Sequence, residues 1–249
     1  QAEGMKKLYD FPLMQGGGRI EGRLVDDKSA EKVLSALDRL ADDKELKRKY
    51  GSDSCFPPVF AMGDGNHSLA TAKEYYEQLK AENPGKDLSH HPARYALVEI
   101  VNLHSPALEF EAIHRIVTGV DTAKFMAELT EKLALSEEIS AQSLTVVDNG
   151  KKKKLYIHNP SSKLAVGSLQ NFLDGYIKEN GGKVDYIHGA EVVEELSMND
   201  DSIGFLLPDM GKEELFPTVI CDGALPRKTF SMGHAEDKRF YVEARKIAL

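Results

Sequence analysis

One short loop of this chain combines several residue types that could carry out chemistry. It reads Gly63, Asp64, Gly65, Asn66, His67 and Ser68. Apolar residues 59–62 precede it, and the apolar spacing that follows is typical of a helix. Asp64 could hold a metal ion or act as a base. His67 could transfer a proton or donate a hydrogen bond to a phosphate group. The loop is therefore a candidate catalytic site.

Its position before a helix also suits an anion. The first turn of a helix presents unpaired backbone N–H groups and a partial positive charge, and phosphate groups bind there readily. Gly63 and Gly65 permit a positive φ and a close approach of the backbone to a ligand. Ser68 adds a hydroxyl at the start of the helix. In this interpretation, Gly63, Gly65, Asn66 and Ser68 contact a phosphate.

The same six residues also fit a simple capped turn. Asp64 or Asn66 would cap the helix, and the glycines would relax the turn. The spacing matches neither a Walker loop nor a dinucleotide fingerprint. The residue types favour neither interpretation over the other, so both stay open.

Further cations and histidines stand in less specific surroundings. On the strand expected at 110–117, His114 and Arg115 face opposite sides, and a structural ion pair is the favoured role. His188 ends an expected strand and either lies in a loop or lines a cleft. Arg227 and Lys228 suit an anion, although solvated cations are the commoner outcome for such a pair.

Composition restricts the partners. The chain has 249 residues, 41% hydrophobic and 29% charged, with a formal net charge of -8. An acidic balance argues against non-specific binding to nucleic acid or to an anionic membrane. Two cysteines form no disulfide framework, which favours a cytoplasmic location. We therefore expect no nucleic acid and no membrane as partners, whereas a small phosphorylated ligand needs only one local cationic pocket. The missing initiator Met suggests a fragment or a processed chain.

The elements expected from hydrophobic periodicity alternate irregularly. Such alternation favours an α+β fold with mixed sheets and flanking helices. A soft boundary near residue 119 suggests regions 1–119 and 120–249, unless they form one continuous unit. We expect helices at 29–50, 67–82, 123–135, 166–179 and 190–198, a helical turn at 211–216, and strands at 18–26, 59–62, 95–102, 110–117, 143–147, 154–158, 184–188, 203–207, 217–221 and 240–247.

Three segments together carry a resemblance to a known family. They are MGDGNHSLATAK at 62–73, HPARYALVEIVNLHSPALEFEAIHRIV at 91–117 and ALPRKTFSM at 224–232. In combination they resemble the bacterial family called domain of unknown function 1015, from about residue 8 to the end of the chain. Members of that family are usually longer at the N-terminus. The resemblance therefore implies that this chain is the C-terminal portion of such a protein.

That family commonly reads Asp-Gly-His-His-Arg at the positions of 64–68. This chain keeps Asp64, Gly65 and His67 but has Ser68 where the family has arginine. One cation that would bind phosphate is thus replaced. The residues that could compensate are Arg94, Arg115, Arg227 and Lys228.

The family motif is in turn similar to the signature of the ParB/sulfiredoxin-like superfamily, in which a strand, a turn and a helix grip nucleotide phosphates. That superfamily includes free-serine kinases, and members of the family tend to occur beside serine-biosynthesis genes. The resemblance implies such a core around Gly63–Ser68, followed by a second α/β subdomain. It also implies a small-molecule kinase that uses Mg²⁺ with ATP or ADP, with free L-serine as the acceptor.

In that kinase, Asp64 and His67 would be the catalytic residues, and Asp64 would also bind the metal ion. Gly63, Gly65, Asn66, Ser68, Arg115, Arg227 and Lys228 would bind the nucleotide. A further base would lie in an N-terminal part of the longer relatives. Two alternatives stay open. One is a regulatory module that binds nucleotide without turnover, and the other is a structural or interaction domain with no ligand.

Overall fold

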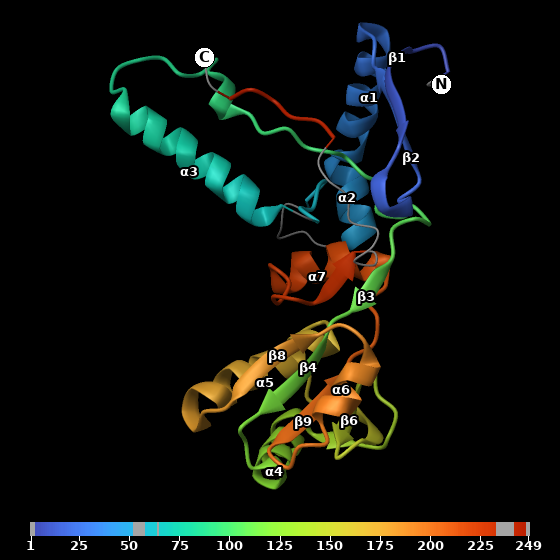
Figure 1. Cartoon of the computed structure of the whole chain (residues 1–249), viewed down its shortest axis with the longest axis vertical. Helices are drawn as coiled ribbons and strands as arrows, with labels where there is room; N and C mark the ends of the chain where they lie inside the picture. Colours follow the sequence, from blue (N-terminus) through green and yellow to red (C-terminus); the bar gives the residue numbers. More distant parts are fainter. Residues whose placement is uncertain (1–2, 52–57, 64, 233–241, 248–249) are drawn as a thin grey trace. The chain divides into compact units, whose positions relative to one another are not determined.

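The chain divides into two compact units (Figure 1). The computed structural model describes residues 3–51, 58–63, 65–232 and 242–247. The first unit comprises Gln1–Ser105 with His234–Leu249, and the second comprises Pro106–Gly233. Residues 119 and 120, between which the sequence suggested a boundary, both fall in the second unit by this division.

The first unit is a hairpin followed by helices. The helix expected at 29–50 is divided in two, because the Asp42 side chain accepts hydrogen bonds from the backbone N–H groups of Lys44 and Glu45, both at 3.0 Å, and so begins a new helix. Its described elements are β1 (Lys6–Pro12), η1 (Met14–Gly16), β2 (Arg19–Leu24), α1 (Asp27–Leu40), α2 (Asp43–Tyr50), α3 (Asn66–Glu82) and η2 (Pro92–Arg94).

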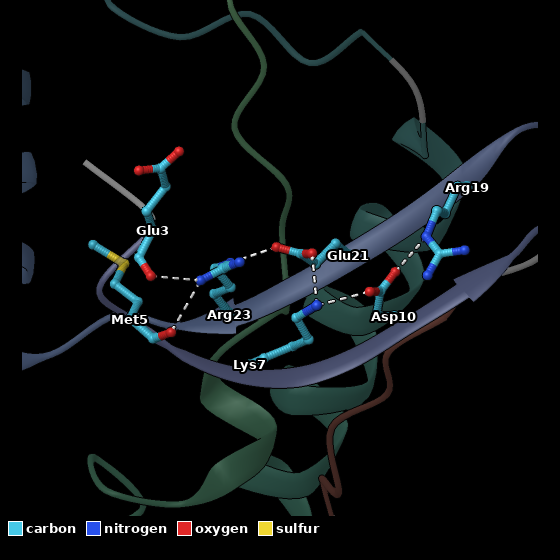
Figure 2. A network of polar contacts seen from close by, with 7 residues as sticks. All are labelled: Glu3, Met5, Lys7, Asp10, Arg19, Glu21 and Arg23. Atoms are coloured by element: carbon cyan, nitrogen blue, oxygen red, sulfur yellow. Dashed lines mark hydrogen bonds and ion pairs between the residues drawn. The ribbon is translucent and has the colours of Figure 1, made fainter.

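Ion pairs line the surface of the hairpin formed by β1 and β2 (Figure 2). Lys7 Nζ lies 2.8 Å from Asp10 Oδ2 and 3.1 Å from Glu21 Oε2. Arg19 Nε lies 2.6 Å from Asp10 Oδ1, and Arg23 pairs with Glu21. Hydrogen bonds from Arg19 and then from Lys7 hold the pKa of Asp10 far below its usual range. Since these pairs are open to solvent, salt screens them and each adds little to stability.

The second unit contains most of the buried core among the described residues. Its elements are β3 (Phe110–Ala112), β4 (His114–Thr118), α4 (Thr122–Leu133), β5 (Leu135–Ser136), β6 (Gln142–Asp148), β7 (Lys151–Ile157), α5 (Ala165–Asn180), β8 (Lys183–Ile187), α6 (Ala190–Leu196), β9 (Ser202–Leu206), η3 (Lys212–Glu214), α7 (Leu215–Asp222) and β10 (Phe230–Met232).

A six-stranded antiparallel sheet forms the centre of the second unit, in the order β5-β7-β6-β9-β4-β8. The hairpin between β6 and β7 turns on Asn149 and Gly150, whose φ values of 48° and 71° are those of a type I′ turn. The sequence predicts strands at 143–147 and 154–158, and the Asp148-Asn149-Gly150 segment between them is a hairpin signal. A separate pair, β3 with β10, joins the two ends of the unit.

Helices cover both faces of this sheet. On one face, Phe205 of β9 lies near Phe125 of α4, with ring centroids 5.9 Å apart, and Phe125 meets Tyr176 of α5 edge to face. On the other face, Gly204 of β9 lies against Val193 of α6. Phe125, Val193 and Phe205 are fully buried. Side chains of successive strand residues point to opposite faces, which is why Gly204 and Phe205 contact different helices.

One predicted strand is a helix. Residues 217–221 were expected to be extended, but they lie within α7. Pro217 is the third residue of that helix, in the first turn, where the N–H that proline lacks has no intrahelical partner in any case. The apolar, β-branched composition of the segment therefore did not determine its backbone conformation.

Three other expected strands are not formed in the described residues. Residues 59–62, 95–102 and 242–247 carry no strand assignment. Leu97, Val98 and Ile100 are 53%, 60% and 59% exposed. A strand needs a neighbouring strand to pair its backbone groups, and none of the described segments pairs with these. A composition typical of strands was therefore not sufficient to make these segments form strands.

The predicted α+β class is confirmed, with antiparallel sheets and flanking helices. No strand precedes the Gly63–Ser68 turn in described residues 58–63, so a ParB/sulfiredoxin-like core stays a prediction. In the described residues, no helix has both the length and the apolar character needed to cross a membrane.

Candidate functional site

The Gly63–Ser68 loop lies at the start of α3, as predicted. Gly65 precedes the helix with φ at 80° and ψ at 19°, and its carbonyl oxygen accepts the first helical hydrogen bond from Leu69 N at 2.9 Å. Within the described residues, no side chain caps this end of α3, and its first turn holds no acidic residue. An approaching anion would thus meet backbone N–H groups and the positive end of the helix without carboxylate repulsion from the first turn.

The described side chains of this loop are open to solvent. Gly63, Asn66, His67 and Ser68 are exposed. A Cβ added to Gly65 would meet nothing within 4 Å, so there is room beside the backbone here. Asp64, to which the sequence assigned both catalysis and a metal ion, lies outside the described residues, as does its alternative role as the helix cap.

Two side-chain contacts support α3. Thr71 Oγ1 donates to the His67 carbonyl oxygen at 2.9 Å, one turn back along the helix. Tyr76 Oη donates to the Leu88 carbonyl oxygen at 3.0 Å and so ties the helix to the segment after it. The loop residues therefore begin a helix of 17 residues that is anchored near its middle.

Arg115 lies in the second unit and is fully buried. It forms no ion pair with a described carboxylate, in contrast to the favoured expectation from sequence. Its Nε donates to Gln170 Oε1 at 3.0 Å, and its Nη1 donates to the Ile113 carbonyl oxygen at 2.6 Å. Burial lowers the pKa of Arg115 to about 10, so the side chain stays charged at neutral pH. The Arg115 side chain is fully buried and donates to neutral acceptors, so it has no exposed surface that a phosphate could contact.

Arg227 and Lys228 lie close by, on the loop before β10. The Arg227 carbonyl oxygen accepts a hydrogen bond from Arg115 Nη2 at 3.3 Å. The Arg227 side chain is 70% exposed, with Nη2 3.5 Å from Asp174 Oδ1. Lys228 has a φ of 57°, which residues other than glycine seldom adopt. Arg227 is accessible beside the buried Arg115, and Lys228 is exposed as well.

The predicted site residues thus form two groups. Gly63, Gly65, Asn66, His67 and Ser68 belong to the first unit, and Arg115, Arg227 and Lys228 belong to the second. Within the second group, one hydrogen bond joins Arg115 to the Arg227 carbonyl oxygen, although 112 residues separate them, and Lys228 follows Arg227 in the chain.

Sequence reasoning missed Tyr186 at this second location. Its ring centroid lies 4.5 Å from the Arg115 guanidinium carbon and 5.7 Å from that of Arg227. Tyr186 and Arg115 are direct cross-strand neighbours on β8 and β4. A single sequence does not reveal this register, because helices and other strands separate β4 from β8 along the chain.

The histidines near the end of the sheet have structural partners. His188 Nε2 lies 2.6 Å from Glu111 Oε2, and His114 Nδ1 accepts a hydrogen bond from the Leu207 backbone N–H at 3.2 Å. In the part of the chain that the structure describes, no three His, Cys, Asp or Glu side chains are grouped so that they could hold a metal ion.

These observations define a two-unit α+β protein. Among the described residues, the start of α3 in one unit has no side-chain cap, and in the other unit the buried Arg115 is hydrogen-bonded to the backbone of the exposed Arg227. Residues 1–176 match the model of the family described as "Protein of unknown function (DUF1015)", and the chain belongs to that family. The resemblance read from the sequence is thereby confirmed at the family level. The match covers the Gly63–Ser68 loop and Arg115, whereas Arg227 and Lys228 lie beyond it. No curated protein and no solved structure matches the chain.

Proposed function

We propose that this protein binds the phosphate groups of ATP or ADP at the start of α3 and transfers a phosphoryl group to a small hydroxyl compound. The supporting observation is the start of α3, which has no side-chain cap and no acidic residue in its first turn among the described residues. Free L-serine is the first acceptor to test, by analogy with the kinases of the superfamily that the loop resembles.

The chain's own residues fit the phosphate groups of a nucleotide. Gly65 has φ at 80°, and a Cβ at this residue would have no neighbour within 4 Å, so a phosphate oxygen can approach the backbone. The N–H groups of the first turn donate to anions at such helix ends. His67 is exposed beside them, where its imidazole would donate a hydrogen bond to a phosphate oxygen or move a proton at the acceptor hydroxyl.

A metal ion would add charge neutralisation, which phosphoryl transfer requires in addition to positioning. Mg²⁺ is usually held by one or two carboxylates together with the phosphates themselves. Asp64 is the carboxylate that the sequence assigns to it. Asp64 lies outside the described residues.

The test begins with nucleotide binding to the whole chain. Thermal unfolding is measured with ATP and with ADP, each with and without Mg²⁺. A ligand that binds only the folded protein, at about 100 times its Kd, adds about 2.7 kcal/mol to the free energy of unfolding. We expect stabilisation of this size in the unmodified chain.

Two variants locate the binding site. Gly65→Ala places a Cβ in the space beside the loop, and Gly85→Ala imposes similar backbone strain beyond the other end of α3, where φ is 83° and a Cβ likewise meets nothing within 4 Å. We expect both variants to lose stability but only Gly65→Ala to lose the response to nucleotide. His67→Ala should weaken the response, whereas His90→Ala, which changes another exposed histidine of the same unit, should not.

Turnover is then measured as ADP and phosphoserine formed from ATP and L-serine. Product that depends on His67 supports the kinase. Binding that Gly65→Ala abolishes, with no product from any small alcohol tested, would overturn transfer and leave the nucleotide-binding module. No response to any nucleotide would overturn both and leave the loop as a capped turn.

A further inference from the structure

The second unit has a pocket beside Tyr186 in which cations predominate. The pocket has a volume of about 400 Å³, within the range of sites for small molecules. Asp174 and Lys178 of α5, Lys183 and Tyr186 of β8, and Arg227 of the loop before β10 line it. We propose that this pocket binds the phosphate group of a small phosphorylated compound, independently of the site at α3.

The local charge of the pocket favours an anion. Three cations line the pocket against a single carboxylate, Asp174. That carboxylate is shared, because its Oδ1 accepts from Gln170 Nε2 at 2.8 Å and lies 3.5 Å from Arg227 Nη2. Lys183 is paired with Asp185 at 2.8 Å, whereas Lys178 has no partner among the described residues. In a chain of net charge -8, such a cationic pocket attracts anions locally.

Contacts with Arg115 and Tyr186 hold Arg227 in place. Arg115 donates through Nη2 to the backbone carbonyl oxygen of Arg227, and both guanidinium groups lie over the ring of Tyr186. Burying a cation that has only neutral hydrogen-bond acceptors lowers the stability of the folded state. Arg115 is therefore a positioning residue, since it fixes the loop and the ring against which Arg227 is presented.

The backbone of the loop before β10 is also strained beside Arg227. Lys228, next to Arg227, has a φ of 57°, and Thr229 Oγ1 donates to the Pro226 carbonyl oxygen at 2.6 Å. Strained residues persist where the surrounding contacts determine them, and they are frequent at ligand sites. The strain lies at the residue that follows the proposed phosphate ligand.

A phosphate monoester suits the pocket better than a monocarboxylate. Arg227 offers a planar fork of N–H donors, and Lys178 and Lys183 add point charges, which together can balance a dianion. The shared chemistry is the phosphate group, so inorganic phosphate is the probe of choice.

The test is a titration of the whole chain with inorganic phosphate, followed by calorimetry, with acetate and KCl at matched ionic strength as comparisons. We expect saturable binding of phosphate that Arg227→Gln weakens about tenfold, since a hydrogen bond to a charged group is worth about 1.5–3 kcal/mol. Lys178→Gln should weaken it less. Lys151→Gln is the matched control, because Lys151 is exposed on β7 of the same unit and does not line the pocket.

Three outcomes would count against the proposal, and one further pattern would support it. Equal binding of acetate would overturn the assignment to phosphate, and an identical curve for Arg227→Gln would overturn the location. Inorganic phosphate could also bind at α3, so Gly65→Ala is titrated in parallel. Binding lost in Gly65→Ala and kept in Arg227→Gln would refute the pocket while leaving the nucleotide site intact. The reverse pattern would support the pocket even if no nucleotide binds.

Discussion

At the scale of single residues, the structure assigns different roles to neighbours that look alike in the sequence. His114 and Arg115 are adjacent and lie on opposite faces of β4. Arg115 is buried on hydrogen bonds to neutral groups, and His114 accepts a hydrogen bond from the Leu207 backbone. The sequence correctly predicted that only one of them could enter a given site. It did not predict which groups each would contact, because those partners come from distant segments.

His114 predicts a pH dependence of stability. Burial, the largest cause, lowers its pKa from the ordinary value of 6.5, and Arg115 and His188 lower it further, while Asp209 and Glu191 oppose the shift. The unfolded chain therefore binds this proton more readily than the folded chain does. Neutral His114 contributes its full stabilisation of the folded state above about pH 6.5. This contribution is lost as the pH falls through the lower pKa that His114 has in the folded chain.

The matched variant is His114→Asn, in which Oδ1 can replace the Nδ1 acceptor without titrating. We expect the free energy of unfolding to fall less between about pH 7 and about pH 5 in His114→Asn than in the unmodified chain. Urea unfolding followed by circular dichroism measures this, since the chain has no tryptophan. A change of the same size in both proteins would contradict the prediction, and His90→Asn serves as an exposed control.

At the scale of elements, prediction from sequence succeeded where a signal was local. The type I′ turn at Asn149 and Gly150 and the apolar face of α5 required only neighbouring residues. Prediction failed at 95–102 and 217–221, where composition alone suggested strands. Pairing partners and tertiary packing decide such segments. In the candidate site, the start of α3 has a local sequence signal and was predicted. The contacts of Tyr186 join residues that are distant in the sequence and were not predicted.

The contact between β9 and α6 makes a prediction at this scale. A Cβ on Gly204 would lie 2.4 Å from Val193 Cγ1 and 3.2 Å from Val147 Cβ. Gly204→Ala should therefore lower the free energy of unfolding by about 1–3 kcal/mol through overpacking. Adding Val193→Ala should restore part of that loss, so that the two substitutions are not additive in a double-mutant cycle.

Gly175→Ala is the control for this prediction. Gly175 is exposed on α5, and a Cβ there meets nothing within 4 Å. Alanine at such a helical position should stabilise the protein by about 0.5–1 kcal/mol. Equal effects of Gly204→Ala and Gly175→Ala would show that the β9–α6 contact does not limit the size of residue 204.

At the scale of the whole molecule, the second unit is inserted into the first. The chain leaves the first unit after Ser105 and returns at His234. The family match ends at residue 176, inside α5, yet β9 lies between β6 and β4 in the sheet and follows that point in sequence. The end of the match is therefore not a structural boundary. A segment cut there would lack an interior strand.

The insertion predicts that residues 106–233 fold without the rest of the chain. This segment contains the six-stranded sheet with helices on both faces and most of the described buried core, so it has the core that independent stability requires. Expressed alone, it should show dispersed amide resonances and cooperative urea unfolding. A segment of 106–176 should not. A disordered 106–233 segment would refute the prediction.

The pairing of β3 with β10 also determines how this unit would respond to tension. Phe110 pairs with Met232 and Ala112 with Phe230, so the points where the chain enters and leaves lie side by side. A pulling force applied to the two ends of the protein would load this short ladder from its Phe110–Met232 end and open its bonds one after another. The six-stranded sheet would bear no load until the ladder had opened. Under tension, the β3–β10 ladder would therefore break before the six-stranded sheet does.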